Sequence, residues 1–145
     1  MTEKLLQISH LGVEFRQPNS TVVAVRDASL DIAEGETVAL VGESGSGKSV
    51  TALSVLQLLP YPLAVHTPGS SIRFRDCELV GADERALREV RGNRVSMIFQ
   101  EPMTSLNPLH VVEKQIIEVL MVHRGLSREA GATFLPRLLL PVGLQ

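Results

Sequence analysis

The sequence predicts an α/β fold, and three observations support this class. The apolar run Val38–Val41 leads directly into a glycine-rich loop, and an apolar segment without glycine or proline follows from Val50 to Leu59. Upstream segments alternate apolar and polar residues, as strands with one wet face do. After Gln100 this β-like pattern stops and helical spacing takes over. We therefore predict an α/β core with an antiparallel β part, followed by the start of a helical part.

The predicted strands lie on both sides of a turn at residues 17–20. Residues 5–15 hold short apolar runs that suit one strand or two half-strands. Ala28, Leu30 and Ile32 alternate with polar residues, which indicates a second strand. The turn at residues 34–36 then leads into the predicted buried strand before the loop.

The chain after the loop begins with a helix that should end by Pro60, because Pro60 and Pro62 force extended backbone. Residues 66–71 are polar and predict a loop. The segments 71–74 and 77–80 are predicted to form a short hairpin pair.

A helix is predicted from Asp83 to Arg91, with Asp83 near its start and Gly92 at its end. Arginines recur every third residue here, and we interpret the stripe as a solvated face, with phosphate or partner contact as the alternative. The stripe comprises Arg85, Arg88, Arg91 and Arg94. An apolar run at 95–99 predicts a further strand that ends at Gln100.

Two more helices are predicted beyond Gln100. The spacing over 111–123 is amphipathic, and Ser127 is suited to cap the helix that follows. Pro136 and Pro141 are expected to interrupt that last segment.

Composition is that of a globular protein, with 145 residues, 44% hydrophobic and 21% charged. The net charge of −2 gives no reason to expect nucleic-acid binding. No apolar run is long enough for a transmembrane helix, and no signal peptide is visible. Cys77 is alone, so an intramolecular disulfide is excluded. The four histidines lack metal-ligand spacing.

The most specific pattern is Gly42–Ser49, which reads Gly-Glu-Ser-Gly-Ser-Gly-Lys-Ser. The spacing matches the P-loop, in which backbone N–H groups and a helix N-terminus cradle nucleotide phosphates. Lys48 would face the β- and γ-phosphates, and the Ser49 hydroxyl would ligate Mg²⁺. The alternative is a plain turn between a strand and a helix, but such a turn does not require a Lys-Ser pair. The predicted fold is thus a P-loop NTPase core.

The run from Val95 to Pro108 resembles the Q-loop region of ABC-transporter ATPase subunits. Its Ser-Leu-Asn-Pro element at 105–108 resembles the element found in one branch of that family, which serves oligopeptide, dipeptide and nickel importers. The spacing from Lys48 to Gln100 and the segment 24–30 also fit that family. The resemblance covers nearly the whole chain, from about residue 5 to residue 144.

This resemblance implies ATP and Mg²⁺ as ligands. Gln100 would lie near Mg²⁺ and the attacking water, because a neutral amide can orient water without adding charge. Phe15 is implied as the residue that stacks on adenine, with ordinary core packing as its alternative. The implied phosphate-binding residues are Gly42, Ser44, Gly45, Ser46, Gly47, Lys48, Ser49 and Val50.

The resemblance also implies partners. These are transmembrane permease subunits, a second ATP-binding subunit and, indirectly, an extracytoplasmic solute-binding protein. The subunit would couple ATP binding and hydrolysis to transport, with peptide import as the implied role. It would lie peripherally on the cytoplasmic face of the inner membrane.

The chain departs from the family pattern in one respect. Before Gln145 it contains no Leu-Ser-Gly-Gly-Gln signature, no acidic strand after the Q-loop and no switch histidine. We therefore expect a truncated chain in which residues 1–100 form the ATP-binding core and 101–145 begin the helical subdomain. Alone, such a chain is expected to be poorly soluble or only marginally folded, and not competent for turnover. The alternatives are a nucleotide-binding or non-functional fragment, or another P-loop kinase or GTPase; no Asn-Lys-x-Asp element of a GTPase is present.

Overall fold

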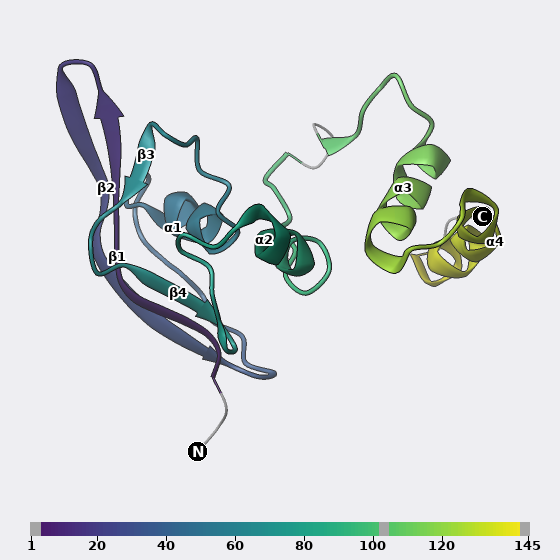
Figure 1. Ribbon diagram of the computed structural model, residues 1–145, viewed down its shortest axis with the longest axis horizontal. Coiled ribbons are helices and arrows are strands. Elements are labelled where there is room, and N and C mark those ends of the chain that lie inside the picture. The colour runs from purple at the N-terminus through teal and green to yellow at the C-terminus, as the bar shows by residue number, and fades with distance from the viewer. Residues whose placement is uncertain (1–3, 102–104, 143–145) are drawn as a thin grey trace. The chain divides into compact units, whose positions relative to one another are not determined.

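The computed structural model describes residues 4–101 and 105–142. The chain forms two compact units, one up to Arg91 and the other from Gly92 onward (Figure 1). The predicted division after residue 100 stays a prediction. Three residues of the Q-loop-like run, Pro102 to Thr104, lie outside the described residues.

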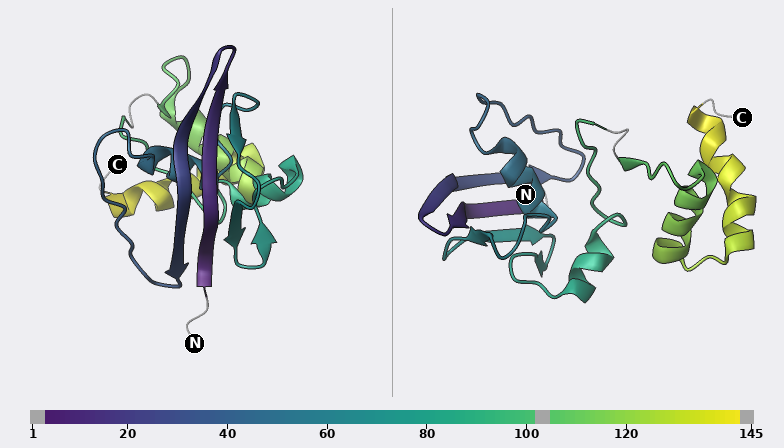
Figure 2. Two further views of the ribbon diagram at one scale, coloured as in Figure 1. Left: turned by 90° about the vertical axis from the view of Figure 1, so that its left-hand side faces the viewer. Right: turned by 90° about the horizontal axis from the view of Figure 1, so that it is seen from above.

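The first unit is built on an antiparallel sheet with the strand order β2-β1-β4-β5, and β3 pairs with β1. The two long strands β1 and β2 form a hairpin and lie side by side in Figure 2. The strands are β1 (Lys4–Gln17), β2 (Ser20–Ala33), β3 (Ala64–His66), β4 (Ser71–Phe74) and β5 (Cys77–Glu78). The predicted strands at 5–15, 28–32 and 71–74 are confirmed, whereas β3 was not predicted.

The core of this unit lies between the sheet and the segment after the glycine-rich loop. Leu11, Val13 and Ile72 are fully buried on the sheet. Helix α1 (Lys48–Val55) and the turn that follows it bury Val55, Leu56 and Leu59. Such burial of branched aliphatic side chains is the main stabilising contribution to a small unit, at about 25 cal/mol per Å² of apolar surface.

Helix α2 (Glu84–Val90) begins where the sequence predicted. The Asp83 carboxylate accepts a hydrogen bond from the Ala86 backbone N–H at 2.8 Å, which caps the helix start. Leu87 and Val90 are buried on its inner face.

The described part of the second unit contains an α-hairpin, α3 (Val112–Arg124) and α4 (Arg128–Leu139), followed by the 3₁₀ turn Leu140–Val142. The predicted cap is confirmed, because the Ser127 hydroxyl accepts from the Ala130 N–H at 3.2 Å. Gly131 packs closely on α3, where a Cβ atom would lie 3.0 Å from Ile117. The expected interruption at Pro136 is wrong: this proline lies inside α4.

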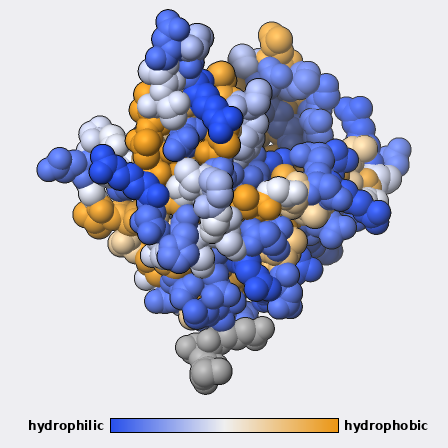
Figure 3. All heavy atoms as spheres, turned by 60° about the vertical axis from the view of Figure 1, so that its left-hand side comes forward, coloured by the Kyte–Doolittle hydropathy of each residue, from blue (hydrophilic) through white to orange (hydrophobic). Residues whose placement is uncertain are grey.

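Two predicted strands are not formed. Residues 37–43 and 96–99 have no regular secondary structure, and both expose large apolar side chains. Val41 is 88% exposed and Ile98 is 93% exposed. A strand requires a neighbour to accept its hydrogen bonds, and within the described residues neither segment pairs with one. Figure 3 shows hydrophobic residues exposed in separate patches on the viewed face.

Candidate functional site

The glycine-rich loop runs into the N-terminus of α1 in the first unit. Gly45 and Gly47 have φ angles of 81° and 88°, the left-handed region that glycine tolerates best. Gly47 is the N-cap of α1, and it offers no side chain to bond the first-turn N–H groups. Those N–H donors and the helix dipole favour an anion at this end of the helix.

Side chains of the loop are folded close to its backbone. The Lys48 Nζ donates to the carbonyl oxygens of Gly42 at 2.7 Å and Glu43 at 2.6 Å, and it contacts the Ser46 hydroxyl at 3.2 Å. A Cβ atom on Gly42 would lie 2.7 Å from that hydroxyl oxygen, so a side chain here would require the Ser46 hydroxyl to move away from Lys48. The ammonium is thereby held over a loop whose backbone N–H groups suit phosphate oxygens.

The remaining predicted site residues lie in three places. Ser49 is exposed in the first turn of α1, and Val50 beside it is half-buried. Phe15 is half-buried on β1, opposite Val22 of β2 and Ala64 of β3. Gln100 belongs to the second unit, where it is exposed.

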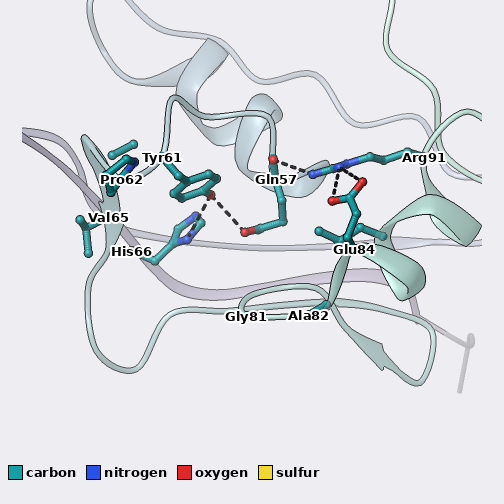
Figure 4. Close-up of a pocket in the computed structure, with 11 residues that line it drawn as sticks. Gln57, Tyr61, Pro62, Val65, His66, Gly81, Ala82, Glu84 and Arg91 are labelled. Carbon is teal, nitrogen blue, oxygen red and sulfur yellow. Dashed lines mark hydrogen bonds and ion pairs between the residues drawn. The ribbon is translucent and has the colours of Figure 1, made fainter.

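A second feature, not predicted from sequence, lies at the opposite end of α1. It is a pocket of about 580 Å³ in the first unit, drawn in Figure 4. On one side, the Tyr61 hydroxyl lies 3.1 Å from Gln57 Oε1 and 3.5 Å from His66 Nδ1. On the other side, the Arg91 guanidinium contacts Glu84 at 3.2 Å.

The orientation of these groups follows from their hydrogen bonds. Gln57 Nε2 donates to the Ser54 carbonyl at 2.7 Å, so its Oε1 faces Tyr61 as an acceptor. The Tyr61 hydroxyl has one hydrogen to donate. If it donates that hydrogen to Gln57 Oε1, a hydrogen bond with His66 requires the tautomer in which Nδ1 carries the proton and donates to the hydroxyl oxygen. His66 Nε2 is buried and has no hydrogen-bond partner among the described residues. Burial lowers the pKa of His66 below its usual value of 6.5 and raises the pKa of Tyr61 above its usual 10.0.

Arg91 corrects the interpretation of the arginine stripe as a solvated face. Its side chain is only 25% exposed, whereas Arg85, Arg88 and Arg94 are exposed. The Nε and Nη2 atoms of Arg91 each donate to a main-chain carbonyl at the end of α1, both at 2.7 Å. The three-residue spacing gave no indication of this difference, because the contact joins segments 34 and 35 positions apart.

Within residues 4–101 and 105–142, no group of three or more His, Cys, Asp or Glu side chains could hold a metal ion. In the same part of the chain, no helix is long and apolar enough to cross a membrane.

Several curated proteins are similar to this chain. It is 57% identical to the "Uncharacterized ABC transporter ATP-binding protein YejF" of Escherichia coli (strain K12), over 90% of this chain and 25% of that protein. It is 53% identical to the "Peptidoglycan transport ATP-binding protein YejF" of Agrobacterium fabrum, over 99% of this chain and 26% of the relative. The "Oligopeptide transport ATP-binding protein OppD" of Bacillus subtilis is 43% identical, over 97% and 39%. The chain therefore spans well under half the length of these relatives.

A solved structure shares the fold. The ATP-binding cassette MJ0796, in a dimeric post-hydrolysis state bound to ADP and Pi, aligns with a TM-score of 0.71 at 22% identity. The alignment covers 88% of this chain and 53% of that one. This likeness confirms the predicted α/β class, of which the described residues form the antiparallel sheet and helices.

Residues 25–137 match the family described as ABC transporter, and this match covers most of the chain and includes the glycine-rich loop. The chain therefore belongs to the ABC transporter family.

Proposed function

We propose that this chain is the nucleotide-binding part of an ABC-transporter ATPase subunit that couples ATP binding and hydrolysis to peptide import. The observation that carries the proposal is the loop at Gly42–Ser49. Two of its glycines have left-handed φ angles, it ends at an uncapped helix N-terminus, and it holds the Lys48 ammonium over its backbone. This arrangement suits a chain of phosphates better than any other common ligand.

Each residue of the proposed nucleotide site has a role that follows from its chemistry. Backbone N–H groups from Ser44 to Val50 would bind the phosphate oxygens, and Lys48 would neutralise charge on the β- and γ-phosphates. Ser49 is exposed in the first turn of α1, and its hydroxyl would hold Mg²⁺. Mg²⁺ would supply charge neutralisation at the phosphates. Gln100 would orient water through its amide, and Phe15 would stack on adenine.

The names of the relatives support the proposed biological role. OppD of Bacillus subtilis is named for oligopeptide transport and YejF of Agrobacterium fabrum for peptidoglycan transport, and the solved structure of MJ0796 is dimeric. We therefore propose permease subunits and a second ATP-binding subunit as partners, with a solute-binding protein acting indirectly. The position would be peripheral, on the cytoplasmic face of the membrane.

The direct test is calorimetric titration of the chain with Mg²⁺-ATP. Lys48→Ala should weaken binding by roughly ten- to a hundredfold, because a hydrogen bond to a charged group contributes about 1.5–3 kcal/mol. Lys114→Ala is the matched control, since Lys114 is an exposed lysine in the second unit. Equal affinities for the two variants, or no binding by the unaltered chain, would contradict the proposal.

Turnover is measured separately from binding. Release of inorganic phosphate that is absent from Lys48→Ala supports an ATPase, whereas binding without phosphate release favours a nucleotide-binding fragment. Phosphoryl transfer to an added acceptor would instead favour a kinase.

A further inference from the structure

The C-terminal end of α1 is held by Arg91, which lies 35 positions after Leu56. Arg91 Nε donates to the Leu56 carbonyl and Nη2 donates to the Gln57 carbonyl, each at 2.7 Å. Nη1 contacts both carboxylate oxygens of Glu84, at 3.3 and 3.2 Å. The planar guanidinium therefore uses all three nitrogens at once, and a lysine could not reproduce this fork.

Both carbonyls belong to residues just beyond Val55, the last residue of α1. The Leu58 N–H bonds the Leu53 carbonyl and the Gln57 N–H bonds the Ser54 carbonyl, both at 3.0 Å, which is a Schellman ending. The carbonyls of Leu56 and Gln57 accept hydrogen bonds from Arg91. A cation at this position also lies at the favourable end of the helix dipole.

Gln57 itself is unusual at such an ending. Its φ angle is 51°, a conformation normally taken by glycine or asparagine at this position. Its side chain bonds the Ser54 carbonyl on one side and Tyr61 on the other, as Figure 4 shows for the Tyr61 contact. Two independent sets of polar contacts thus hold the same end of one helix.

The other end of that helix carries the proposed phosphate site. Helix α1 has only 8 residues, Lys48–Val55, so it is about 12 Å long. Lys48 and Ser49 form its first turn, and a rigid element of this length transmits a displacement from one end to the other. Arg91 also directly precedes the segment of sequence that leads to Gln100.

We propose that Arg91 is a positioning residue for nucleotide binding, which holds the C-terminal end of α1 so that Lys48 and Ser49 keep their place at the phosphates. This inference rests on the proposed nucleotide-binding function. Arg91 acts through the helix and does not touch the nucleotide. Tyr61 contacts the same end of the helix, so its fluorescence reports on that end. The signal is specific because Tyr61 is the only tyrosine and the chain has no tryptophan.

The test compares three variants by calorimetry with Mg²⁺-ATP, at a temperature where circular dichroism shows each to be folded. Arg91→Ala should weaken binding about tenfold, the equivalent of one charged hydrogen bond. The affinity of Arg91→Lys should lie between those of Arg91→Ala and the unaltered chain, because lysine keeps the charge without the planar set of donors. Asp83→Ala is the matched control: it removes the cap of α2 and lowers stability in the same segment, but should bind as the unaltered chain does.

Tyr61 fluorescence supplies the second readout, with Mg²⁺-tripolyphosphate as a probe that does not absorb near 280 nm. We expect a saturable change in the unaltered chain and, at the same probe concentrations, in Asp83→Ala. The change should require about tenfold more probe in Arg91→Ala and roughly ten- to a hundredfold more in Lys48→Ala. Unaltered affinity and an unaltered Tyr61 response in both Arg91 variants would overturn the inference while leaving the proposed function intact. Failure of the unaltered chain to bind either probe would overturn both.

Discussion

The carbonyl oxygen of Ala24 on β2 lies only 2.6 Å from the position that a Cβ atom on Gly47 would occupy. The Val25 side chain lies 3.0 Å from the same point. Gly47 also has a φ of 88° and begins α1, so this glycine lets the helix start directly against the sheet. The position of the loop on β2 therefore depends on the absence of a side chain.

Gly47→Ala should accordingly destabilise the first unit by more than the 1–2 kcal/mol that left-handed backbone costs a residue with a Cβ atom. Gly45→Ala is the matched control, since Gly45 has a similar φ of 81° but nothing within 4 Å of its Cβ position. Urea unfolding measures both free energies. Equal losses would show that the approach to Ala24 contributes nothing.

The backbone conformation of Arg75 indicates that glycine at this position would stabilise the folded chain. This residue lies in the turn between β4 and β5 with a φ of 51°, and its ion pair with Glu34 is long, at 3.7 Å, and exposed. Arg75→Gly should raise the free energy of unfolding by roughly 0.5–1 kcal/mol, because glycine adopts left-handed backbone without steric cost and exposed ion pairs contribute little. Asp76→Gly, at the neighbouring position of the same turn, should destabilise instead. A loss of stability in both variants contradicts this explanation.

His66 predicts how stability depends on pH. Burial lowers its pKa in the folded chain below the usual 6.5, so the unfolded chain takes up a proton first as the pH falls. This group should not affect the free energy of unfolding well above pH 6.5. The free energy of unfolding should decrease as the pH falls through about 6.5 toward the pKa of His66 in the folded chain. The measurement is the urea midpoint from about pH 7.5 to about pH 5.5.

His66→Gln should remove this part of the pH dependence. His110→Gln, which alters an exposed ring in the second unit, should retain it. A slope that persists in His66→Gln would assign the titration to another group.

Local patterns in the sequence predicted the features that local interactions determine. The cap at Ser127 was predicted because a short polar side chain bonds an N–H three residues on, and the loop at Gly42–Ser49 was predicted because its chemistry is contiguous. Asp83 was expected in the first turn of its helix, and the structure places it one position earlier, as the N-cap. The contact of Arg91 with Leu56 was not predictable from local patterns, because it joins segments that are distant in sequence. The left-handed backbone of Gln57 was not predictable either, because glutamine has no preference for that conformation.

Strand pairing explains the remaining differences. The short strand β3 forms only because it pairs with β1, and its three residues carry no pattern of their own. Conversely, the runs at 38–41 and 95–99 have strand-like composition but no strand beside them within the described residues. An apolar run therefore predicts the tendency to pair, while the pairing itself depends on residues elsewhere.

The exposed run that contains Ile98 predicts self-association of the chain. Ile98 is 93% exposed in a segment of strand-like composition that pairs with no strand among the described residues, and such segments associate through edge pairing and apolar contact. Ile98→Ser should lower light scattering at high protein concentration and leave the urea midpoint unchanged, because an exposed side chain contributes little to folding. Leu109→Ser is the matched control: Leu109 is 88% exposed but lies in a turn region without strand character. If Leu109→Ser reduces scattering as much as Ile98→Ser, general surface hydrophobicity and not strand pairing drives the association.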